Sequence, residues 1–194
     1  MHRLISVAAL GAASLTLINA QTDLWQSLRR TDTSKLTEQA RHMKLPVSEQ
    51  NGIRQLLRKE RDVWTCDSDD LKGEWVCNVQ FRSLLVTPAA RVILAEAGHG
   101  CARGGQGANG AMWLLRFDGH KPILLAGPQQ QFDGFLYSVQ RTSNKGYQDI
   151  ILGWHRGGGE TGLNYFRFNG LQYRSVGSAI LRRDQTGAVE ITPQ

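Results

Sequence analysis

Cysteine is scarce in this sequence, with 3 residues in a chain of 194, and no two of them form the Cys-x-x-Cys pairs that are typical of structural zinc sites. Other short chemical motifs are missing as well. The chain has no His-x-x-x-His pair, no nucleophile elbow and no Walker-type phosphate loop. Basic runs with interleaved aromatic residues, which are typical of nucleic-acid-binding proteins, are also absent. The sequence therefore predicts no resident metal or cofactor and no nucleic-acid partner.

Long apolar runs are also lacking, with one exception near the start of the chain. Residues 4–18 are uncharged and mostly apolar, they follow Arg3, and Ile18-Asn19-Ala20 has the pattern of a cleavage site. We expect residues 1–20 to be an export signal, with a mature chain that starts at Gln21, is periplasmic or secreted, and has no stable membrane insertion. A retained membrane anchor is the alternative, because apolar length separates the two imperfectly.

The chain carries a modest excess of positive charge. Residues 1–20 contain one arginine and no acidic residue, so their removal lowers the net charge from +6 to +5. A basic excess favours anionic surfaces such as polyanionic glycans, phospholipid headgroups or acidic proteins, although it can also serve solubility alone. The remaining 174 residues (194 less 20) are enough for one domain with its own core.

The three cysteines would enter an oxidising compartment after export. Cys66 and Cys77 flank a polar stretch that is long enough to turn a hairpin, so a Cys66–Cys77 disulfide is predicted. Cys101 is then left over: it is either unpaired or the true partner of one of the others.

A polar, charge-rich segment precedes the folded domain. Residues 21–47 have few apolar anchors, and we expect an arm or linker there. A helix is expected from Ser48, an N-cap residue, because Ile53, Leu56 and Leu57 recur at helical spacing on one side. This short apolar stripe favours packing on the domain's own sheet over binding to a membrane surface.

Short strand-like runs, separated by glycine, proline, asparagine and aspartate, fill the rest of the chain. They cover residues 63–66, 75–81, 84–87, 91–96, 111–117, 122–125, 134–142, 149–154, 163–168 and 173–178, with shorter runs at 180–183 and 188–192. This spacing predicts one mainly β domain over residues 48–194, an antiparallel sandwich, barrel or partial propeller with a short N-terminal helix. Strands and helices do not alternate further, which argues against a Rossmann-like sheet.

An internal repeat links two parts of this domain. Residues 112–119 and 163–170 each consist of a strand that ends in Arg-Phe followed by Asp-Gly or Asn-Gly. Such a strand ending is a strong hairpin signal. The repeat therefore predicts two related hairpins within about 91–127 and 149–178.

A loop of known type precedes the second copy. Residues 144–153, with Gly146, Tyr147 and Asp149, resemble the integrin-type β-propeller repeat, whose loop usually binds calcium through several aspartates and asparagines. Here the loop has Lys145 and no carboxylate before Asp149, so calcium binding is not carried over. The turn geometry is carried over: we expect a positive φ at Gly146 and a hydrogen bond between the Asp149 carboxylate and the loop.

A second resemblance covers residues 91–176, which look like uncharacterised secreted bacterial proteins. These share a Gly-rich Cys loop before a Trp strand, matched by residues 98–101 and Trp113, and a Tyr-Arg-Phe-x-Gly hairpin, matched with Phe166 in the Tyr place. That group often has a second cysteine shortly before the Trp, where this chain has Ala111 and Met112. The resemblance implies a shared architecture and brings no activity with it.

Two arginine–glycine loops, which begin at Arg103 and Arg156, are the strongest binding candidates. Glycine runs can turn successive N–H groups inward to form an anion-binding concavity, and arginine adds a fork of donors. The alternative is that they are hairpin tips. Trp154, beside a glycine and next to His155, is the best candidate for an exposed ring, whereas Trp113 is expected in the core.

These features favour binding over catalysis. We expect an exported envelope protein that binds an anionic glycan or another secreted protein through the face that carries Arg103, Trp154, His155 and Arg156. One alternative is an envelope hydrolase or metal-dependent enzyme that uses His99, His155 and Glu160. Another is a purely structural envelope protein.

Overall fold

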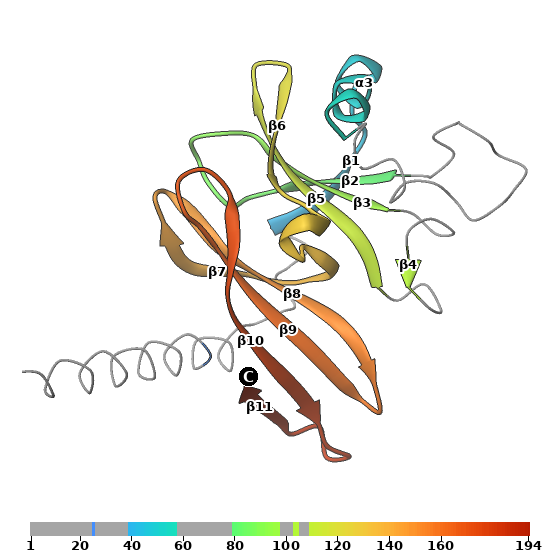
Figure 1. Ribbon diagram of the computed structural model, residues 1–194, viewed down its shortest axis with the longest axis vertical. Helices are drawn as coiled ribbons and strands as arrows, with labels where there is room; N and C mark the ends of the chain where they lie inside the picture. Colours follow the sequence, from blue (N-terminus) through green and yellow to red (C-terminus); the bar gives the residue numbers. More distant parts are fainter. Residues whose placement is uncertain (1–24, 26–38, 58–78, 98–102, 105–108) are drawn as a thin grey trace, which may run out of the picture.

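The computed structural model describes residue 25 and residues 39–57, 79–97, 103–104 and 109–194 (Figure 1). The expected export signal at residues 1–20, the strand at 63–66, His99 and all three cysteines lie outside the described residues. The Cys66–Cys77 disulfide therefore stays a prediction.

The described chain is mainly β, as predicted, with one short helix near its N-terminal side. The strands are β1 (Ala40–Met43), β2 (Val79–Leu84), β3 (Val92–Ala97), β4 (Arg103–Gly104), β5 (Asn109–Asp118), β6 (Lys121–Ala126), β7 (Asp133–Asn144), β8 (Tyr147–Gly157), β9 (Glu160–Phe168), β10 (Tyr173–Arg183) and β11 (Val189–Pro193). The helix is α3 (Val47–Leu56), and a 3₁₀ turn, η4 (Pro128–Gln130), joins β6 to β7. All pairings between described strands are antiparallel.

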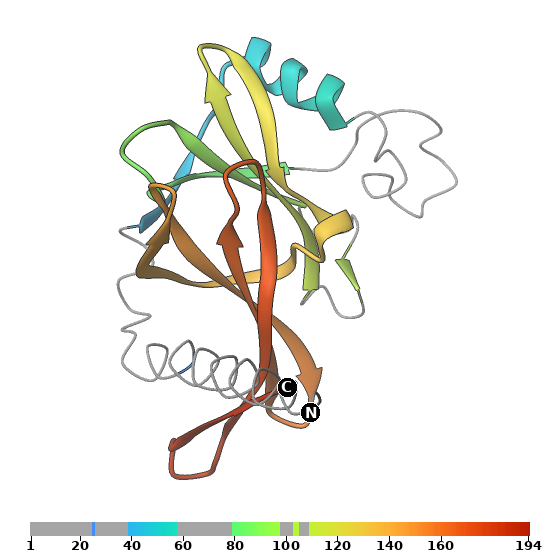
Figure 2. The ribbon, with the colours of Figure 1, turned by 60° about the vertical axis from the view of Figure 1, so that its left-hand side comes forward.

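The strands form one sheet in the order β1-β2-β3-β5-β7-β8-β9-β10-β11, with β4 and β6 paired to β5 beside this path. β5 is the junction. Its later residues pair with β3 and β6, whereas Gly110 and Ala111 at its start pair with Gly134 and Asp133 of β7. Figures 1 and 2 show the result: β1–β3, β5 and β6 lie at one end with α3, and β8–β11 extend away at the other. No ladder between described strands joins β1 to β11, so this part of the chain is a folded-over open sheet.

The sheet folds so that one face of each half contributes to a shared core. This central core contains Val92, Leu94, Met112, Leu114, Phe132, Leu136, Ile150, Leu152, Phe166, Phe168 and Tyr173, among others. Burying this much aliphatic and aromatic surface is the main stabilising contribution, at about 25 cal/mol per Å² of apolar area.

The outer faces are covered as well. Ile53 and Leu57 of the α3 region pack on Ile93, Ala95, Trp113 and Leu115 on the first half. Trp25 packs on Tyr165 on the second half, with ring centroids 5.8 Å apart and an edge-on geometry. Because both faces of β3, β5 and β8 are buried, these strands have continuous apolar runs in place of polar–apolar alternation.

The helix begins one residue before the predicted start. Its N-cap is Pro46, no side chain caps it, and the Pro46 carbonyl accepts the Gln50 N–H at 3.0 Å, so the prediction of Ser48 as N-cap is wrong. Of the predicted apolar stripe, Ile53 is buried, but Leu56 is 39% exposed. The buried side is rotated toward Glu49, which lies one turn before Ile53.

Three strand predictions need correction. β1 lies inside the segment expected to be an arm, and it pairs with β2. β2 runs from Val79 to Leu84, across the boundary drawn between the runs at 75–81 and 84–87. β10 is one strand where two runs were expected, because a bulge between Ser175 and Gly177 shifts its alternation: Tyr173 faces the central core, and Ala179 and Leu181 face outward.

Both copies of the internal repeat are hairpin strands, as predicted, but their turns differ. β5 and β6 are joined by Gly119 and His120 alone, with Gly119 at φ 58°. β9 and β10 are joined by the loop 169–172, in which the Asn169 carboxamide oxygen accepts the N–H groups of Leu171 and Gln172. The copies therefore share a strand ending and not a turn type.

The two copies also turn opposite faces toward the central core. Met112 and Leu114 face it in the first copy, and the matching positions of the second copy, Leu163 and Tyr165, face outward. The repeated sequence is thus used in two different environments, and the copies are not interchangeable modules.

Candidate functional site

The arginine–glycine segment after β8 forms a tight hairpin. Gly157 pairs with Glu160, so Gly158 and Gly159 are the whole turn, with φ values of 61° and 79°. Both values lie in the left-handed region that favours glycine. The glycine run is therefore needed for the β8–β9 connection itself.

Trp154 lies on β8 four residues before Gly158, and its indole ring covers Gly162 of β9. Trp154 and Gly162 are paired in register, and a Cβ atom at Gly162 would overlap the ring. Trp154 is half-buried, whereas Trp113, Tyr165 and Phe166 are fully buried. Of these four aromatic residues, Trp154 is thus the one with an accessible ring, as predicted.

Charged side chains lie on the same face as Trp154, closer to the end of the sheet. Glu160 accepts a hydrogen bond from Arg182 Nε at 2.8 Å, and this contact raises the pKa of Arg182. Arg156 Nε lies 3.7 Å from Glu160 Oε2, and Arg156 Nη1 is 3.5 Å from Gln194 Oε1. Arg156 lies in a bulge between His155 and Gly157, and both of its contacts are long for hydrogen bonds.

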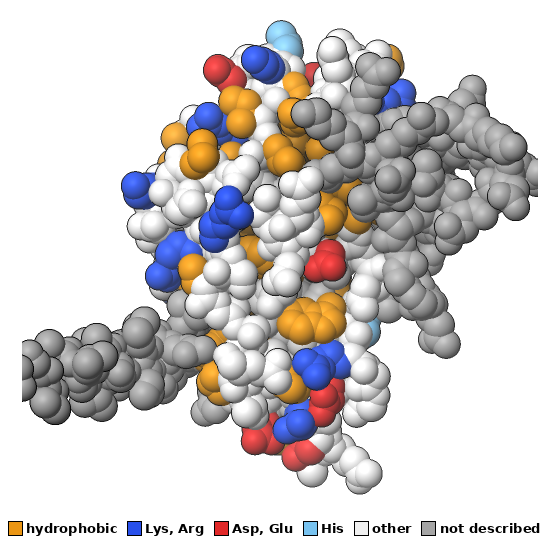
Figure 3. Space-filling view, viewed as in Figure 1, with side chains coloured by type: hydrophobic (Ala, Val, Ile, Leu, Met, Phe, Trp, Pro, Cys, Tyr) orange, Lys and Arg blue, Asp and Glu red, His pale blue; other side chains and the backbone are white. Residues whose placement is uncertain are grey.

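A hollow of about 430 Å³ opens beside these residues. It is lined by Gly158, Gly159, Glu160, Arg182, Arg183, Asp184, Ala188, Val189 and Glu190. Asp184 is engaged in the β10–β11 turn, where hydrogen bonds from Thr186 and from backbone N–H groups lower its pKa. The lower end of Figure 3, over β8–β11, shows the resulting mixture of basic and acidic side chains.

His155 points to the other face of β8. Its ring stacks on Phe135 with centroids 5.0 Å apart and planes tilted by 35°, and Phe135 in turn covers Gly153. Glu160 lies on the opposite face with its arginines, so the His155–Glu160 pair of the enzyme alternative is not brought together; His99 lies outside the described residues. Among the described residues, no cluster of three or more His, Cys, Asp or Glu side chains could hold a metal ion.

Asn109 connects Arg103 to this end of the sheet. The backbone of β4 pairs with Asn109 and Gly110. The Asn109 side chain accepts the His155 N–H at 2.8 Å and donates to the His155 carbonyl at 3.2 Å. Asn109 was missed by the sequence analysis, and no local pattern marks it. Gly162 was missed too, although a glycine inside a strand often marks a close approach.

Asp149 holds the other end of β8 and β9 together. It is fully buried, and Arg167 donates to it from Nη2 at 2.9 Å and from Nε at 3.3 Å. Tyr165 donates to it at 3.2 Å, and burial raises the pKa of Tyr165. The prediction of a hydrogen bond between the Asp149 carboxylate and its loop is therefore wrong, because the carboxylate accepts from Arg167 and Tyr165 of the neighbouring strand. Gly146 does have the expected positive φ, 80°.

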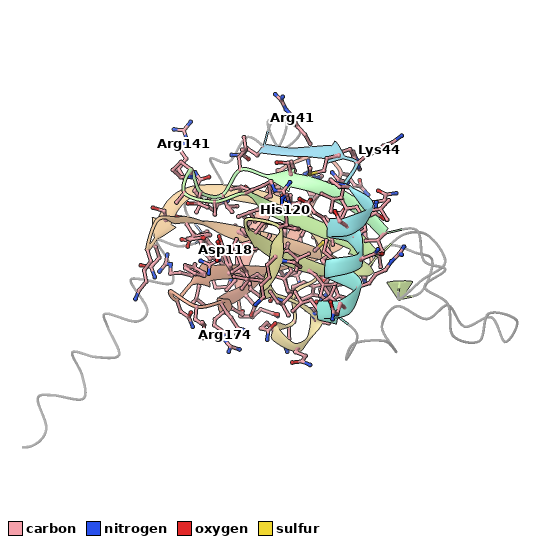
Figure 4. The ribbon with its side chains drawn as sticks, turned by 90° about the horizontal axis from the view of Figure 1, so that it is seen from above. Arg41, Lys44, Asp118, His120, Arg141 and Arg174 are labelled. Carbon is pink, nitrogen blue, oxygen red and sulfur yellow. The ribbon has the colours of Figure 1, made fainter. Side chains whose placement is uncertain are left out.

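A second buried carboxylate was also missed. Glu49 of α3 is 3% exposed and accepts a hydrogen bond from Arg91 Nη2 at 2.6 Å. His120 Nδ1, in the β5–β6 turn, lies 3.5 Å from the same oxygen (Figure 4). The Arg91 contact lowers the pKa of Glu49 against the opposing effect of burial. This contact ties α3 to the sheet.

No protein-family model matches the chain, and no match was found among curated proteins or solved structures. No helix in the described residues has the length and apolar character needed to cross a membrane.

Proposed function

We propose that this protein is an exported, non-catalytic binding protein that holds a carboxylate-bearing glycan of the cell envelope at the β8–β11 end of its sheet. The observation that carries the proposal is the partly exposed Trp154 side chain, whose ring lies over Gly162 on the face that also bears Glu160 and Arg182. An aromatic ring fixed in advance offers a flat apolar platform to a sugar at little entropic cost.

Arg156 supplies the positive charge that would pair with a carboxylate of the ligand. Its contacts at 3.5 and 3.7 Å are too long to be strong, so its guanidinium keeps donors for a ligand. A carboxylate on the sugar would form the bidentate pair that Arg156 does not make within the chain. Glu160 is already bonded to Arg182 at 2.8 Å and holds the surrounding charges in place.

The test is retention of the purified chain on immobilised polygalacturonate, with neutral dextran as the comparison. We expect Trp154→Ala to weaken binding about tenfold through the lost stacking surface. Arg156→Gln should remove the preference for polygalacturonate over dextran. Export is checked by the intact mass of the chain recovered from its native compartment, which should equal that of a chain starting at Gln21.

His155→Ala is the matched control, because His155 is exposed on the same strand and faces the other way. It should bind as the parent does. Equal binding by Trp154→Ala and the parent, or an equal loss in His155→Ala, would reject the site. If the chain bound a secreted protein and neither glycan, the ligand would be a protein and not a glycan.

A further inference from the structure

Three turns meet at the end of the sheet opposite to the proposed glycan site. They are the β2–β3 loop (residues 85–91), the β7–β8 turn (residues 145–146) and the β9–β10 loop (residues 169–172). Together with Arg141 and Arg174, these residues are called the basic end below.

Hydrogen bonds join the three turns through Gln148. Its N–H donates to the Val86 carbonyl at 2.7 Å, and its carbonyl accepts the Tyr173 hydroxyl at 2.8 Å. The Asn144 carboxamide donates to the Phe168 carbonyl at 2.8 Å. The basic end is therefore a single built surface.

Aromatic packing supports this surface from behind. The Tyr147 and Phe168 rings lie 4.2 Å apart, and Phe168 and Tyr173 lie 5.5 Å apart. The Lys145 side chain crosses Gly170, where a Cβ atom would lie 3.0 Å from it. The turns are thus held in fixed positions relative to one another.

The charge of the basic end has one sign. Arg141, Lys145 and Arg174 are exposed, and none of the three turns contains an acidic residue. The neighbouring Asp149 is fully buried and bonded to Arg167. Figure 3 shows basic side chains on the left-hand side over these turns, and Figure 4 shows Arg141 and Arg174 pointing outward on opposite sides of this end.

Two leucines protrude from the same turns. Leu171 is 76% exposed in the β9–β10 loop, and Leu85 is 60% exposed at the start of the β2–β3 loop. A glycan would use the cations and leave such aliphatic tips in water. A lipid surface uses both, because cations bind the anionic headgroups and apolar tips enter the headgroup–acyl boundary.

We propose that the basic end adsorbs to the surface of an anionic phospholipid bilayer, with Arg141, Lys145 and Arg174 on the headgroups and Leu85 and Leu171 inserted between them. This site is separate from the proposed glycan site and does not depend on it. Adsorption of this kind is peripheral and reversible, and it needs no membrane-spanning segment.

The test is co-sedimentation of the full chain with vesicles of phosphatidylcholine and phosphatidylglycerol (3:1), with pure phosphatidylcholine vesicles alongside. We expect binding only to the anionic vesicles. It should weaken as salt rises from about 20 to about 200 mM, because the Debye length shortens over that range. The triple variant Arg141→Gln, Lys145→Gln, Arg174→Gln should lose about 100-fold in partition coefficient, at roughly fivefold for each cation. Leu85→Ser with Leu171→Ser should weaken binding about tenfold and leave its salt dependence in place.

The matched control is Lys44→Gln, Arg54→Gln, Lys121→Gln, which removes the same number of charges from exposed positions on and near α3. It should bind anionic vesicles nearly as the parent does. The proposal is overturned if the parent does not sediment with the anionic vesicles at low salt, or if both triple variants lose binding equally. It is also overturned if the leucine variant binds as the parent does, which would leave only non-specific charge attraction. Thermal unfolding of each variant confirms that it is folded.

Discussion

Asp149 has no exposed surface, and the groups that bond its carboxylate, Arg167 and Tyr165, both lie on β9. The Tyr165 hydroxyl donates its one hydrogen to Asp149, so at the 2.8 Å contact with Thr142 it accepts and the Thr142 hydroxyl donates. The contact with Asp149 raises the pKa of Arg167, whose side chain is 39% exposed. The pair is therefore asymmetric: one partner can reach water and the other cannot.

This asymmetry predicts unequal costs for the two halves of the pair. Arg167→Gln should lower the free energy of unfolding by about 3 kcal/mol, because it leaves a buried carboxylate without its cation. Asp149→Asn should cost only about 1.5 kcal/mol, because the freed guanidinium can turn to solvent. Urea unfolding followed by circular dichroism measures both. Arg174→Gln, at the position paired with Arg167 on β10, is the control and should change stability by less than about 0.5 kcal/mol. A larger cost for Asp149→Asn than for Arg167→Gln would contradict this account.

At the scale of an element, α3 is held to the sheet by contacts of three kinds. Ile53 and Leu57 bury apolar surface against the first half of the sheet. Gly52 brings the helix close to Pro122 of β6, where a Cβ atom would lie 3.3 Å from the proline ring. Glu49 accepts the Arg91 hydrogen bond at 2.6 Å, and Arg91 itself lies over the Phe117 ring at 4.4 Å.

The Glu49 contact predicts a dependence on pH. Because the folded state lowers the pKa of Glu49 below its ordinary value of 4.5, the contact stabilises the fold above that pH. Its contribution is lost as the pH falls through the folded-state pKa. The thermal midpoint of Glu49→Gln should therefore lie below that of the parent at pH 7, and the gap should narrow as the pH falls from 5 to about 3.

Asp118→Asn serves as the control for that measurement, since Asp118 is exposed at the neighbouring hairpin (Figure 4). Its difference from the parent should stay small across the same range. A Glu49→Gln gap that is constant with pH would show that the carboxylate charge does not hold the helix.

At the scale of the whole molecule, the order of strands sets where the fold is most protected. β8 and β9 each have strand neighbours on both sides. Their residues face the central core on one side, and on the other side Ile151, Leu163 and Tyr165 pack with Trp25. β1 and β11 end the order of described strands, and most of β11 is exposed. Local opening is therefore expected to start from the ends of the order.

Native-state hydrogen exchange followed by NMR checks this expectation. The amides of Ile151, Leu152 and Tyr165 should exchange last, at rates that follow global unfolding. The amides of β11 should exchange through local opening at least tenfold faster. Equal protection of β11 and β9 would mean that the edge strand opens only with the whole domain.

Much of the fold was predictable because strand and turn signals are local. The runs at 111–117 and 163–168, the hairpins after Asp118 and Asn169, and the positive φ of Gly146 all follow from residue types within a few positions. β1 and the continuity of β10 were missed for a reason of the same kind. β1 is short and lies in a polar segment, and the bulge after Ser175 breaks the alternation that marks a strand.

The candidate site was predictable only in part. Residue types alone select Trp154 as an accessible ring and Arg156 as a cation beside a turn. They do not show that His155 faces away, or that Asn109 binds the His155 backbone from a distant strand.

The sequence by itself therefore determined the mainly β class, the positions of the tight turns and the residues whose side chains could bind a ligand. Only the tertiary structure decided which of those residues share a face. In strands buried on both sides the apolar pattern does not say which face meets which core, and each bulge reverses the alternation. Long-range contacts such as Glu49 with Arg91, and the gathering of three turns at Gln148, exist only once the sheet has folded over on itself.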